Sequence, residues 1–368
     1  MNPLRALWEE HGQAVWLDYI ERELLTGGGL EALVRRDGVR GVTSNPSIFK
    51  SAITGSAAYD GDVNAFLAAH PDATTDQLYE ALAIADIRMA ADILAPVFES
   101  SGGTDGFVSL EVSPHLAHDT AGTEAEAKRL WRAVERPNLM IKVPATAAGV
   151  PALENLIAAG INVNATLMFS LADYEAVANA YLRGLGRRDD PAGVASVASF
   201  FVSRVDTKID AALEEVGTDA ALELRGRAAI ANSRLAYRRF LELFHGAAFA
   251  GLAERGAQVQ RPLWASTSTK NPSYPDILYV EELIGPETVN TLPMATVDAY
   301  RDHGRPESKL AGSFAEDEAL LGRLPELGID LDAVTRELQT EGVASFADAF
   351  DQLMAALDVK RTARVAAG

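Results

Sequence analysis

Short, nearly continuous apolar runs alternate with amphipathic segments from one end of the chain to the other. Continuous apolar runs are typical of parallel strands covered by helices, whereas alternation of apolar and polar residues is typical of strands with one exposed face. The runs predict eight strands, at residues 15–20, 39–45, 106–112, 139–145, 160–168, 197–203, 261–268 and 288–293. Eight strands that alternate with helices favour a closed (β/α)8 TIM barrel over an open doubly wound sheet.

The segments between the strands carry signals of helices. Thr74 and Gln77 predict a capping box, and apolar residues follow them at spacings of four and three. Asn45 and Pro46 suit the N-cap and the first position of a short helix. These signals support helices on the outside of the barrel.

The chain after the eighth strand is long enough for additional helices. We predict an irregular stretch around residues 304–328, then helices within 329–360, one of which begins at Ser345. There is no low-complexity linker in this part of the chain. We therefore interpret residues 1–368 as one barrel domain, with residues 304–368 as an extra helical segment packed on the barrel.

The composition is that of an ordinary globular protein, with 368 residues, of which 48% are hydrophobic and 23% charged. The chain contains no cysteine, which excludes disulfides, a cysteine nucleophile and cysteine-ligated zinc. A net charge of −19 disfavours nucleic acids and membranes as partners, so any phosphorylated substrate needs local cations. The sequence lacks a signal-peptide pattern and a run of membrane-spanning length, so we expect a cytoplasmic protein. The acidic surface neither requires nor excludes a homodimer.

Polar residues gather at the C-terminal ends of the predicted strands, where the active site of a β/α barrel lies. A carboxylate or a lysine within an apolar strand is costly to bury without a partner or a function. One such residue carries little weight, whereas several on successive strands indicate a site. They are Asp18, Thr43, Asn45, Glu111, Lys142, Asn164, Thr166, Ser199, Arg204, Ser266 and Lys270.

Lys142 lies in the apolar run LMIKVPAT. A lysine amine attacks a ketone only in its neutral form, and desolvation by apolar neighbours lowers the pKa of a lysine and makes this form accessible. Lys142 is therefore a candidate Schiff-base nucleophile. The structural alternative is a lysine that snorkels to solvent or pairs with Glu111 or Asp18.

Two carboxylates are candidates for proton transfer. Glu111, in SLEVSP, ends the strand that precedes the strand of Lys142, so a barrel places the two residues close together. A carboxylate there can move protons during carbinolamine formation and dehydration. Asp18, in VWLDYI, is a second candidate base. The structural alternatives are an ion-pair partner for Glu111 and a loop-capping carboxylate for Asp18.

Asn45, Asn164, Thr166 and Ser199 can hydrogen-bond sugar hydroxyl groups or hold a water, although such residues are also common in turns. Their clustering at predicted strand ends gives the binding interpretation its weight. A sugar-binding site therefore remains one of two interpretations for these residues.

Arg204 and Lys270 are the local cations that a phosphate needs in so acidic a chain. Loops after the late strands are a frequent phosphate site in barrels of this kind. The alternative for both residues is a surface salt bridge.

Six segments resemble the transaldolase family. GVTSNPSIF is similar to the family's second-strand signature, LMIKVPAT to the segment with the Schiff-base lysine, and GINVNATLMFS to the fifth-strand motif. SLEVSP, ASFFVSRVD and PLWASTSTKNP match further blocks of the family. The resemblance spans roughly residues 12–300, and the motifs together are highly specific.

The resemblance implies catalytic roles for four residues. Lys142 would form the Schiff base. Glu111 would shuttle protons through a water that Thr166 also holds. Asp18 would take the proton of the donor's C4 hydroxyl as the C3–C4 bond breaks.

The resemblance also implies binding roles. The donor's hydroxyl groups would be held by Asn45, Asn164 and Ser199, and its phosphate by Arg204 and Ser266. Many relatives have an arginine two residues after the serine of the seventh strand, whereas this chain has Ser268 there, and Lys270 would take its place. Phe201 would lie beside the Schiff base, where related fructose 6-phosphate aldolases have a tyrosine.

The implied reaction belongs to the pentose phosphate pathway. Sedoheptulose 7-phosphate and glyceraldehyde 3-phosphate would give erythrose 4-phosphate and fructose 6-phosphate. The iminium ion itself withdraws electrons, so we expect neither a metal nor a cofactor, and we interpret His115 and His118 as loop histidines. The alternative enzyme is a Schiff-base aldolase that releases dihydroxyacetone, similar to fructose 6-phosphate aldolase. A non-catalytic sugar-phosphate-binding barrel is disfavoured because the lysine and both carboxylates are present.

Overall fold

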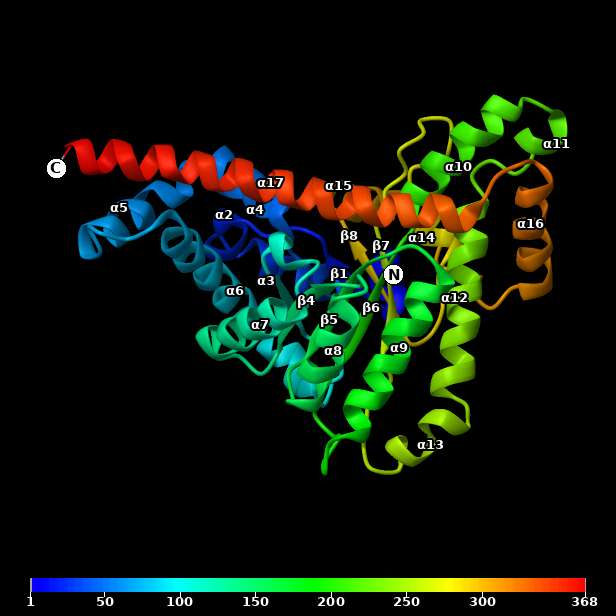
Figure 1. The fold of residues 1–368 in the computed structure, drawn as a ribbon, viewed down its shortest axis with the longest axis horizontal. Helices are drawn as coiled ribbons and strands as arrows, with labels where there is room; N and C mark the ends of the chain where they lie inside the picture. Colours follow the sequence, from blue (N-terminus) through cyan, green and yellow to red (C-terminus); the bar gives the residue numbers. More distant parts are fainter. Residues whose placement is uncertain (1, 368) are drawn as a thin grey trace.

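The computed structural model describes residues 2–367 and contains a closed barrel of eight parallel strands (Figure 1). The strands pair in chain order, and β8 closes the barrel on β1. They are β1 (Gln13–Leu17), β2 (Val39–Val42), β3 (Val108–Glu111), β4 (Leu139–Pro144), β5 (Val163–Met168), β6 (Ser196–Phe201), β7 (Arg261–Ala265) and β8 (Thr288–Leu292). The predicted (β/α)8 barrel is therefore confirmed.

Several predicted strands were too long at their C-terminal ends. Asp18 follows β1, Asn45 follows β2 and Ser266 follows β7, although each fell within a predicted strand. The chain leaves the hydrogen-bonded ladder at these points, while the sequence pattern continues into the loops. These residues therefore lie in the loops at the C-terminal mouth of the barrel, where the site was expected.

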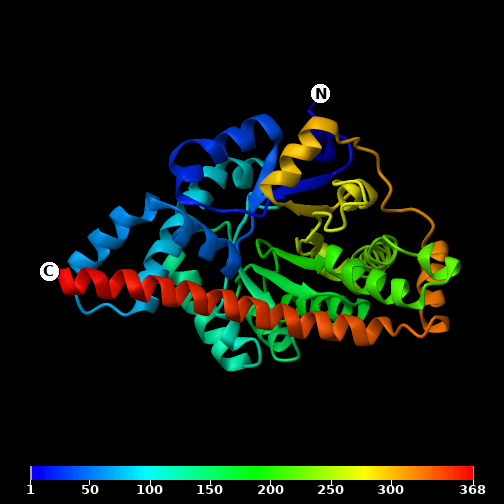
Figure 2. The same cartoon turned by 90° about the horizontal axis from the view of Figure 1, so that it is seen from above.

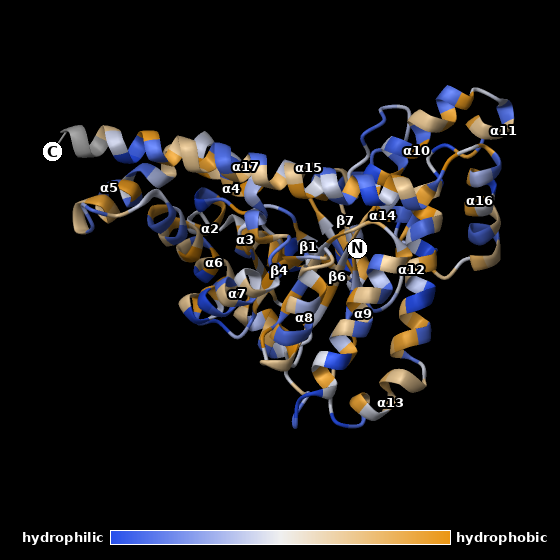
Figure 3. Cartoon of the chain, in the orientation of Figure 1, coloured by the Kyte–Doolittle hydropathy of each residue, from blue (hydrophilic) through white to orange (hydrophobic). Residues whose placement is uncertain are grey.

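Helices surround the barrel, and most combine polar and apolar residues along their length (Figure 3). No helix within residues 2–367 is long and apolar enough to cross a bilayer. They are α1 (Pro3–Glu9), α2 (Arg22–Thr26), α3 (Gly29–Asp37), α4 (Pro46–Gly55), α5 (Asp60–Ala69), α6 (Thr75–Ser100), α7 (Thr120–Val134), α8 (Gly149–Ala158), α9 (Leu171–Gly186), α10 (Ser203–Val216), α11 (Asp219–Leu222), α12 (Ala228–Phe244), α13 (Ala247–Ala253), α14 (Leu278–Glu282), α15 (Met294–His303), α16 (Phe314–Glu326) and α17 (Leu331–Ala367), with short 3-10 helices η1 (Ala57–Tyr59) and η2 (Pro114–Leu116).

The helix starts predicted at Thr74 and Asn45 are confirmed. Thr74 caps α6 by accepting a hydrogen bond from the backbone N–H of Gln77 (3.2 Å), and the Gln77 side chain accepts from the backbone N–H of Thr74 (2.9 Å). Asn45 caps α4 by accepting from the backbone N–H of Ile48 (3.0 Å), and Pro46 is the first residue of that helix.

The C-terminal segment differs from its prediction. Much of the stretch predicted as irregular, 304–328, forms α16, and Ser345 lies within one continuous helix, α17, instead of starting a helix. Serine is tolerated inside a helix, and favourable residues on both sides of Ser345 continue the helical pattern. α17 crosses the molecule as a straight rod and packs against α4, α6 and α10 (Figures 1 and 2).

Two features hold α17 close to the barrel mouth. The side-chain amide of Gln339 donates hydrogen bonds to the carbonyl oxygens of Ala145 and Leu167, both at 3.1 Å, just beyond β4 and within β5. A Cβ added at Gly342 would lie 2.9 Å from a methyl carbon of Leu167 and 3.8 Å from the Arg204 guanidinium. The absence of a side chain at Gly342 thus permits the close approach of α17 to the mouth.

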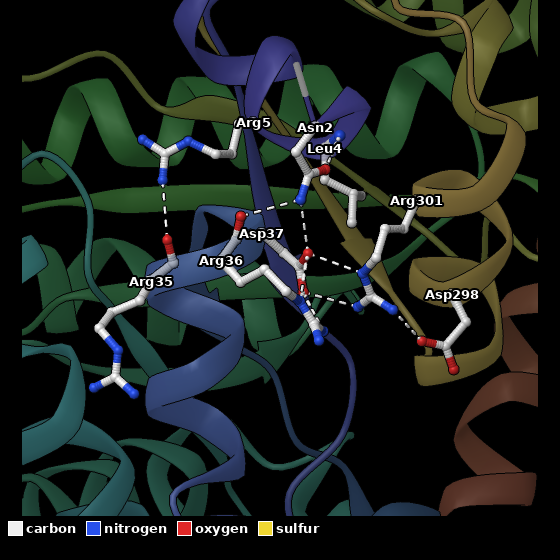
Figure 4. Close-up of polar contacts among 8 residues, drawn as sticks. All are labelled: Asn2, Leu4, Arg5, Arg35, Arg36, Asp37, Asp298 and Arg301. Carbon is white, nitrogen blue, oxygen red and sulfur yellow. Dashed lines mark hydrogen bonds and ion pairs between the residues drawn. The ribbon is translucent and has the colours of Figure 1, made fainter.

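A buried carboxylate joins three helices near the N-terminal end of β2 (Figure 4). Asp37, the last residue of α3, accepts hydrogen bonds from Asn2 (2.8 Å), Arg36 (2.7 Å) and Arg301 of α15 (2.8 Å). Burial raises the pKa of Asp37, but these hydrogen bonds outweigh burial and lower the pKa to about 2. The cluster ties the start of the chain to the helix that follows the last strand.

Candidate active site

A cavity of about 310 Å³ opens at the C-terminal ends of the strands. Two of the predicted site residues, Glu111 and Asn164, do not line it. The predicted residues that line it are Asp18, Thr43, Asn45, Lys142, Thr166, Ser199, Phe201, Arg204, Ser266 and Lys270. The fold therefore brings together side chains that are far apart in the sequence.

Lys142 and Glu111 form a buried ion pair. They are register partners on β4 and β3, and Lys142 Nζ lies 3.2 Å from Glu111 Oε2. Their side chains are only 6% and 3% exposed. Lys142 Nζ also donates a hydrogen bond to the carbonyl oxygen of Ser44 (3.1 Å). Burial raises the pKa of Glu111, and the nearby Lys142 opposes this increase.

Two buried polar atoms near the pair have no polar partner among the described residues. They are Glu111 Oε1, since Oε2 faces Lys142, and the hydroxyl of Thr166. Thr166 belongs to β5, the next strand after that of Lys142. Because nearly all buried polar atoms in proteins are hydrogen-bonded, these groups are suited to contact a substrate or a bound water.

Asp18 is held by neighbouring hydroxyl groups. Thr43 Oγ1 donates a hydrogen bond to Asp18 Oδ1 (2.6 Å), and Thr43 is itself 2.7 Å from the hydroxyl of Thr291. Burial raises the pKa of Asp18, while Lys142 and Thr43 oppose this increase. The sequence placed Thr43 at the end of a predicted strand, but its hydrogen bond to Asp18 is seen only in the structure.

Asn164 lies below the cavity, and its hydrogen bonds are made within the barrel. Its side-chain amide donates to Ser109 Oγ (3.0 Å), and its carbonyl oxygen accepts from Ser199 Oγ (2.7 Å). Ser199 lines the cavity, whereas Asn164 does not. Asn164 thus fixes the orientation of Ser199.

Two cations, Arg204 and Lys270, line the cavity. Arg204 is in the first turn of α10 and has no ion-pair partner among residues 2–367; its guanidinium lies 5.3 Å from the ring centre of Phe201. Lys270 Nζ donates to Ser268 Oγ (2.7 Å). Burial lowers the pKa of both Arg204 and Lys270, and nearby Asp18 opposes this in each case. Two cations in one cavity, one of them in the first turn of a helix, provide a place for an anion.

The backbone is strained at two positions in the site. Leu167, next to Thr166, has φ of 59°, and Ser266 has φ of 56°. Positive φ is unfavourable for residues other than glycine and occurs often at functional sites. Ser266 Oγ lies 3.0 Å from Ser203 Oγ, which links the β7 loop to the start of α10.

Phe346 is a site residue that the sequence did not reveal. It comes from α17 and lines the cavity, and its ring centre lies 5.6 Å from Lys142 Nζ. This distance is within the range of a cation–π interaction. The helical pattern around Phe346 predicted only packing, because nothing in the local sequence indicates that the helix returns to the barrel mouth.

His115 lies in η2, and its Nε2 is 2.7 Å from Asp351 Oδ1 on α17. His115 thus contributes to the attachment of α17. Within the described part of the chain, no group of three or more histidine, aspartate or glutamate side chains is arranged to hold a metal ion.

Comparison with known proteins identifies the family. The family described as Transaldolase/Fructose-6-phosphate aldolase matches residues 15–357. The chain is 52% identical to "Transaldolase" of Thiobacillus denitrificans over 348 residues, which cover 94% of this chain and 96% of the relative. It is 50% identical to "Transaldolase 1" of Streptomyces coelicolor, with coverage of 95% and 92%. It is 48% identical to "Transaldolase" of Mycolicibacterium smegmatis, with coverage of 96% of both chains. The chain therefore belongs to the transaldolase/fructose-6-phosphate aldolase family.

Proposed function

We propose that the cavity at the barrel mouth catalyses the transaldolase reaction through a Schiff base on Lys142. Relatives that are about half identical over nearly the whole chain support the activity, which is that of a transferase. The observation that carries the mechanism is the buried pair of Lys142 and Glu111, 3.2 Å apart, beside a cavity that also contains Asp18.

Lys142 must lose a proton before it can attack, because an ammonium group is not a nucleophile. Glu111 is the nearest acceptor, and burial favours its neutral form. Transfer of a proton from Lys142 to Glu111 converts a buried ion pair into two neutral groups and so relieves the cost of two buried charges. The pair thereby supplies both the nucleophile and the acid that the next step requires.

The first half of the reaction forms the iminium ion. Lys142 Nζ adds to the ketone carbon C2 of the donor, and the carbonyl oxygen takes up a proton to give a carbinolamine. Glu111 then protonates this hydroxyl group, directly or through a water held with Thr166, and the hydroxyl leaves as water. The unpartnered hydroxyl of Thr166 and the unpartnered Oε1 of Glu111 support this role.

The second half transfers the three-carbon unit. Asp18 takes the proton of the C4 hydroxyl, the C3–C4 bond breaks, and its electrons move to the iminium nitrogen to give an enamine. Erythrose 4-phosphate leaves when the donor is sedoheptulose 7-phosphate. The enamine then attacks the aldehyde carbon of glyceraldehyde 3-phosphate, and hydrolysis of the new iminium ion gives fructose 6-phosphate.

We place the substrate phosphate at Arg204, Lys270 and Ser266. The two cations line the same cavity as Lys142, and Arg204 lies at the N-terminal end of α10. Together they offset the repulsion that a chain of net charge −19 exerts on an anionic substrate. Charged sugar phosphates do not readily cross membranes, so we also propose a cytoplasmic location.

Phe201 favours transfer over release of dihydroxyacetone. Its ring lines the cavity and packs against Phe169, with ring centres 5.1 Å apart. A phenyl ring has no hydroxyl group with which to protonate the enamine, so the enamine persists until an acceptor aldehyde binds. A fructose 6-phosphate aldolase activity remains the second candidate function, because the matching family includes both enzymes.

A paired assay tests the proposal. Borohydride reduction in the presence of fructose 6-phosphate should leave a three-carbon adduct on the peptide that contains Lys142, as measured by mass spectrometry. Product formation should depend on erythrose 4-phosphate as acceptor. Absence of an adduct would contradict Schiff-base chemistry, and dihydroxyacetone release that does not depend on the acceptor would favour the aldolase.

A further inference from the structure

A second cavity, of about 530 Å³, lies on the other side of Glu111 from the substrate cavity. It lies between the end of β3 and helices α4, α6, α7 and α17, and we name it the rear cavity. The residues that define it here are Phe49, Tyr79, Ala83, Glu111, Glu126 and Phe350. Its rim includes the exposed side chains of Asp76, His115 and Arg129, so it opens to solvent.

Glu111 lies between the two cavities, whose linings also share Asn45. Its carboxylate contacts Lys142, which lines the substrate cavity, but Glu111 itself lines the rear cavity. Its Oε2 is paired with Lys142 Nζ (3.2 Å), but its Oε1 has no polar partner among the described residues, although the side chain is only 3% exposed. A buried carboxylate of this kind needs polar contacts, and the rear cavity is the adjoining space that is large enough to supply them.

α17 separates the openings of the two cavities. Phe346 lines the substrate cavity, whereas Phe350, one helical turn further on, lines the rear cavity. The ring of Phe350 packs edge-on against Tyr79, with ring centres 5.4 Å apart. The pair of His115 and Asp351 holds the same turn of α17 to the barrel side (2.7 Å). One helix therefore forms a wall of both cavities.

The proposed chemistry requires water and protons at Glu111 while the substrate occupies the other cavity. Formation of the iminium ion releases one water, and its hydrolysis consumes one. We propose that the rear cavity is a separate port through which water and protons reach Glu111 during these two steps. This inference rests on the proposed Schiff-base function and adds a route that is distinct from the substrate entrance.

The polar groups of the rear cavity suit a proton relay. Tyr79 and Glu126 both line it, and Glu126 accepts a hydrogen bond from the backbone N–H of Ser113 (3.3 Å), two residues after Glu111. Burial raises the pKa of Glu126 and of Tyr79, and the nearby carboxylate of Glu111 adds to the increase for Tyr79. Both groups are therefore protonated more readily than they would be in water, and a protonated group can relay a proton to Glu111 by taking up another from the water of the cavity as it donates its own.

The charge of the rear cavity keeps it separate from the substrate route. Asp76 and Glu80 line it, and its cation Arg129 is already bound to both carboxylate oxygens of Glu80. An anionic sugar phosphate is repelled by this surface, whereas water is not. The cations Arg204 and Lys270 line the substrate cavity instead.

Three variants test the port. Ala83→Phe places a ring in the rear cavity, and Tyr79→Phe removes the relay hydroxyl while it keeps the ring contacts. Ala85→Phe is the matched control, because Ala85 is on the same helix, is partly exposed and does not line the cavity. None of these residues lines the substrate cavity.

The measurement is enzyme-dependent exchange of a heavy oxygen isotope from labelled water into the C2 carbonyl of fructose 6-phosphate, without acceptor, by mass spectrometry. We expect exchange to fall about tenfold or more in Ala83→Phe and severalfold in Tyr79→Phe, which is less than the roughly 10²–10⁴ that a directly positioned proton donor contributes, because both residues act through Glu111. Tyr79→Phe should also show a larger solvent deuterium isotope effect on kcat, whereas the KM for fructose 6-phosphate should not change. Ala85→Phe should behave as the unmodified protein does.

Unchanged exchange and an unchanged isotope effect in Tyr79→Phe would overturn the port, whether or not Ala83→Phe folds. If borohydride still traps the adduct in that variant, the Schiff-base function stands and only the port is lost. If the unmodified protein shows neither an adduct nor exchange, the proposed function fails and the port fails with it.

Discussion

Glu111 and Lys142 are register partners on β3 and β4, and their charged ends lie 3.2 Å apart in the barrel interior. Removal of either side chain leaves the other as a buried group without its partner, which is strongly destabilising for charged groups. Substitutions in this pair must therefore be chosen so that a loss of chemistry can be separated from a loss of folding.

Lys142→Arg makes this separation. Arginine keeps a positive charge beside Glu111 but stays protonated and cannot form a Schiff base. We expect loss of the borohydride adduct and a decrease in kcat of roughly a thousandfold or more, with a melting temperature closer to that of the unmodified protein than Lys142→Ala shows. A full-strength adduct in Lys142→Arg would place the nucleophile elsewhere.

Arg204→Ala should weaken the binding of phosphorylated substrates. Loss of a charge-assisted contact costs about 1.5–3 kcal/mol, which corresponds to roughly a tenfold to hundredfold increase in KM. Reaction with unphosphorylated dihydroxyacetone should change much less. Arg132→Ala, an exposed arginine of α7, is the control and should leave both substrates unaffected. An equal loss on both substrate types would indicate a structural role for Arg204.

Phe201→Tyr should shift the enzyme from transfer towards cleavage. The added hydroxyl group lies in the substrate cavity and can protonate the enamine before an acceptor binds. The expected result is a severalfold or larger increase in free dihydroxyacetone relative to transfer, measured with and without erythrose 4-phosphate. An unchanged ratio would show that other residues determine the fate of the enamine.

Phe346→Leu should reduce the population of the iminium intermediate. The ring faces Lys142 Nζ at 5.6 Å, and an interaction of this type contributes about 0.5–2 kcal/mol. We expect less trapped adduct at equal substrate saturation and a lower kcat. Phe314→Leu is a matched control, because Phe314 packs beneath Arg238 (6.0 Å) outside the substrate cavity. Equal effects of the two substitutions would argue against a role for the ring at Lys142.

The titration of Asp37 should make the free energy of unfolding depend on pH in acid. Its pKa falls from an ordinary value of 3.8 to about 2 on folding, so its stabilisation is complete above pH 3.8 and is lost as the pH falls through about 2. A shift of this size contributes on the order of 2 kcal/mol. Asp37→Asn should therefore lower the free energy of unfolding at neutral pH and make it less dependent on pH between about 4 and 2. Denaturant unfolding at several pH values measures both effects, and an unchanged slope in this window would contradict them.

The barrel and the closeness of Lys142 to Glu111 could be predicted because they depend on short-range patterns. Apolar runs identify strands, and consecutive strands of a β/α barrel are neighbours. The depth of a side chain is harder to predict, because it depends on how the strands are staggered around the barrel. Thr166 and Asn164 are two residues apart on β5, yet Thr166 lines the cavity and Asn164 lies below it.

The contribution of Phe346 could not be predicted, because it depends on the path of α17 over the barrel mouth. The sequence around Ser345 is compatible both with a helix that starts there and with one that continues through it. Packing against α4, α6 and α10 and the hydrogen bonds of Gln339 select the continuous helix. Tertiary contacts of this kind cannot be predicted from the local sequence pattern.

The position of Phe346 near the end of the chain has a consequence for the order in which the enzyme is synthesised and folds. All eight strands are synthesised before Phe346, so a nascent barrel can close around Lys142 while one wall of its catalytic site is still missing. On the proposed Schiff-base function, a newly closed barrel has its nucleophile but lacks the wall that Phe346 contributes to the substrate cavity. The proposed mechanism therefore implies that full activity requires α17 to be docked, in addition to a closed barrel.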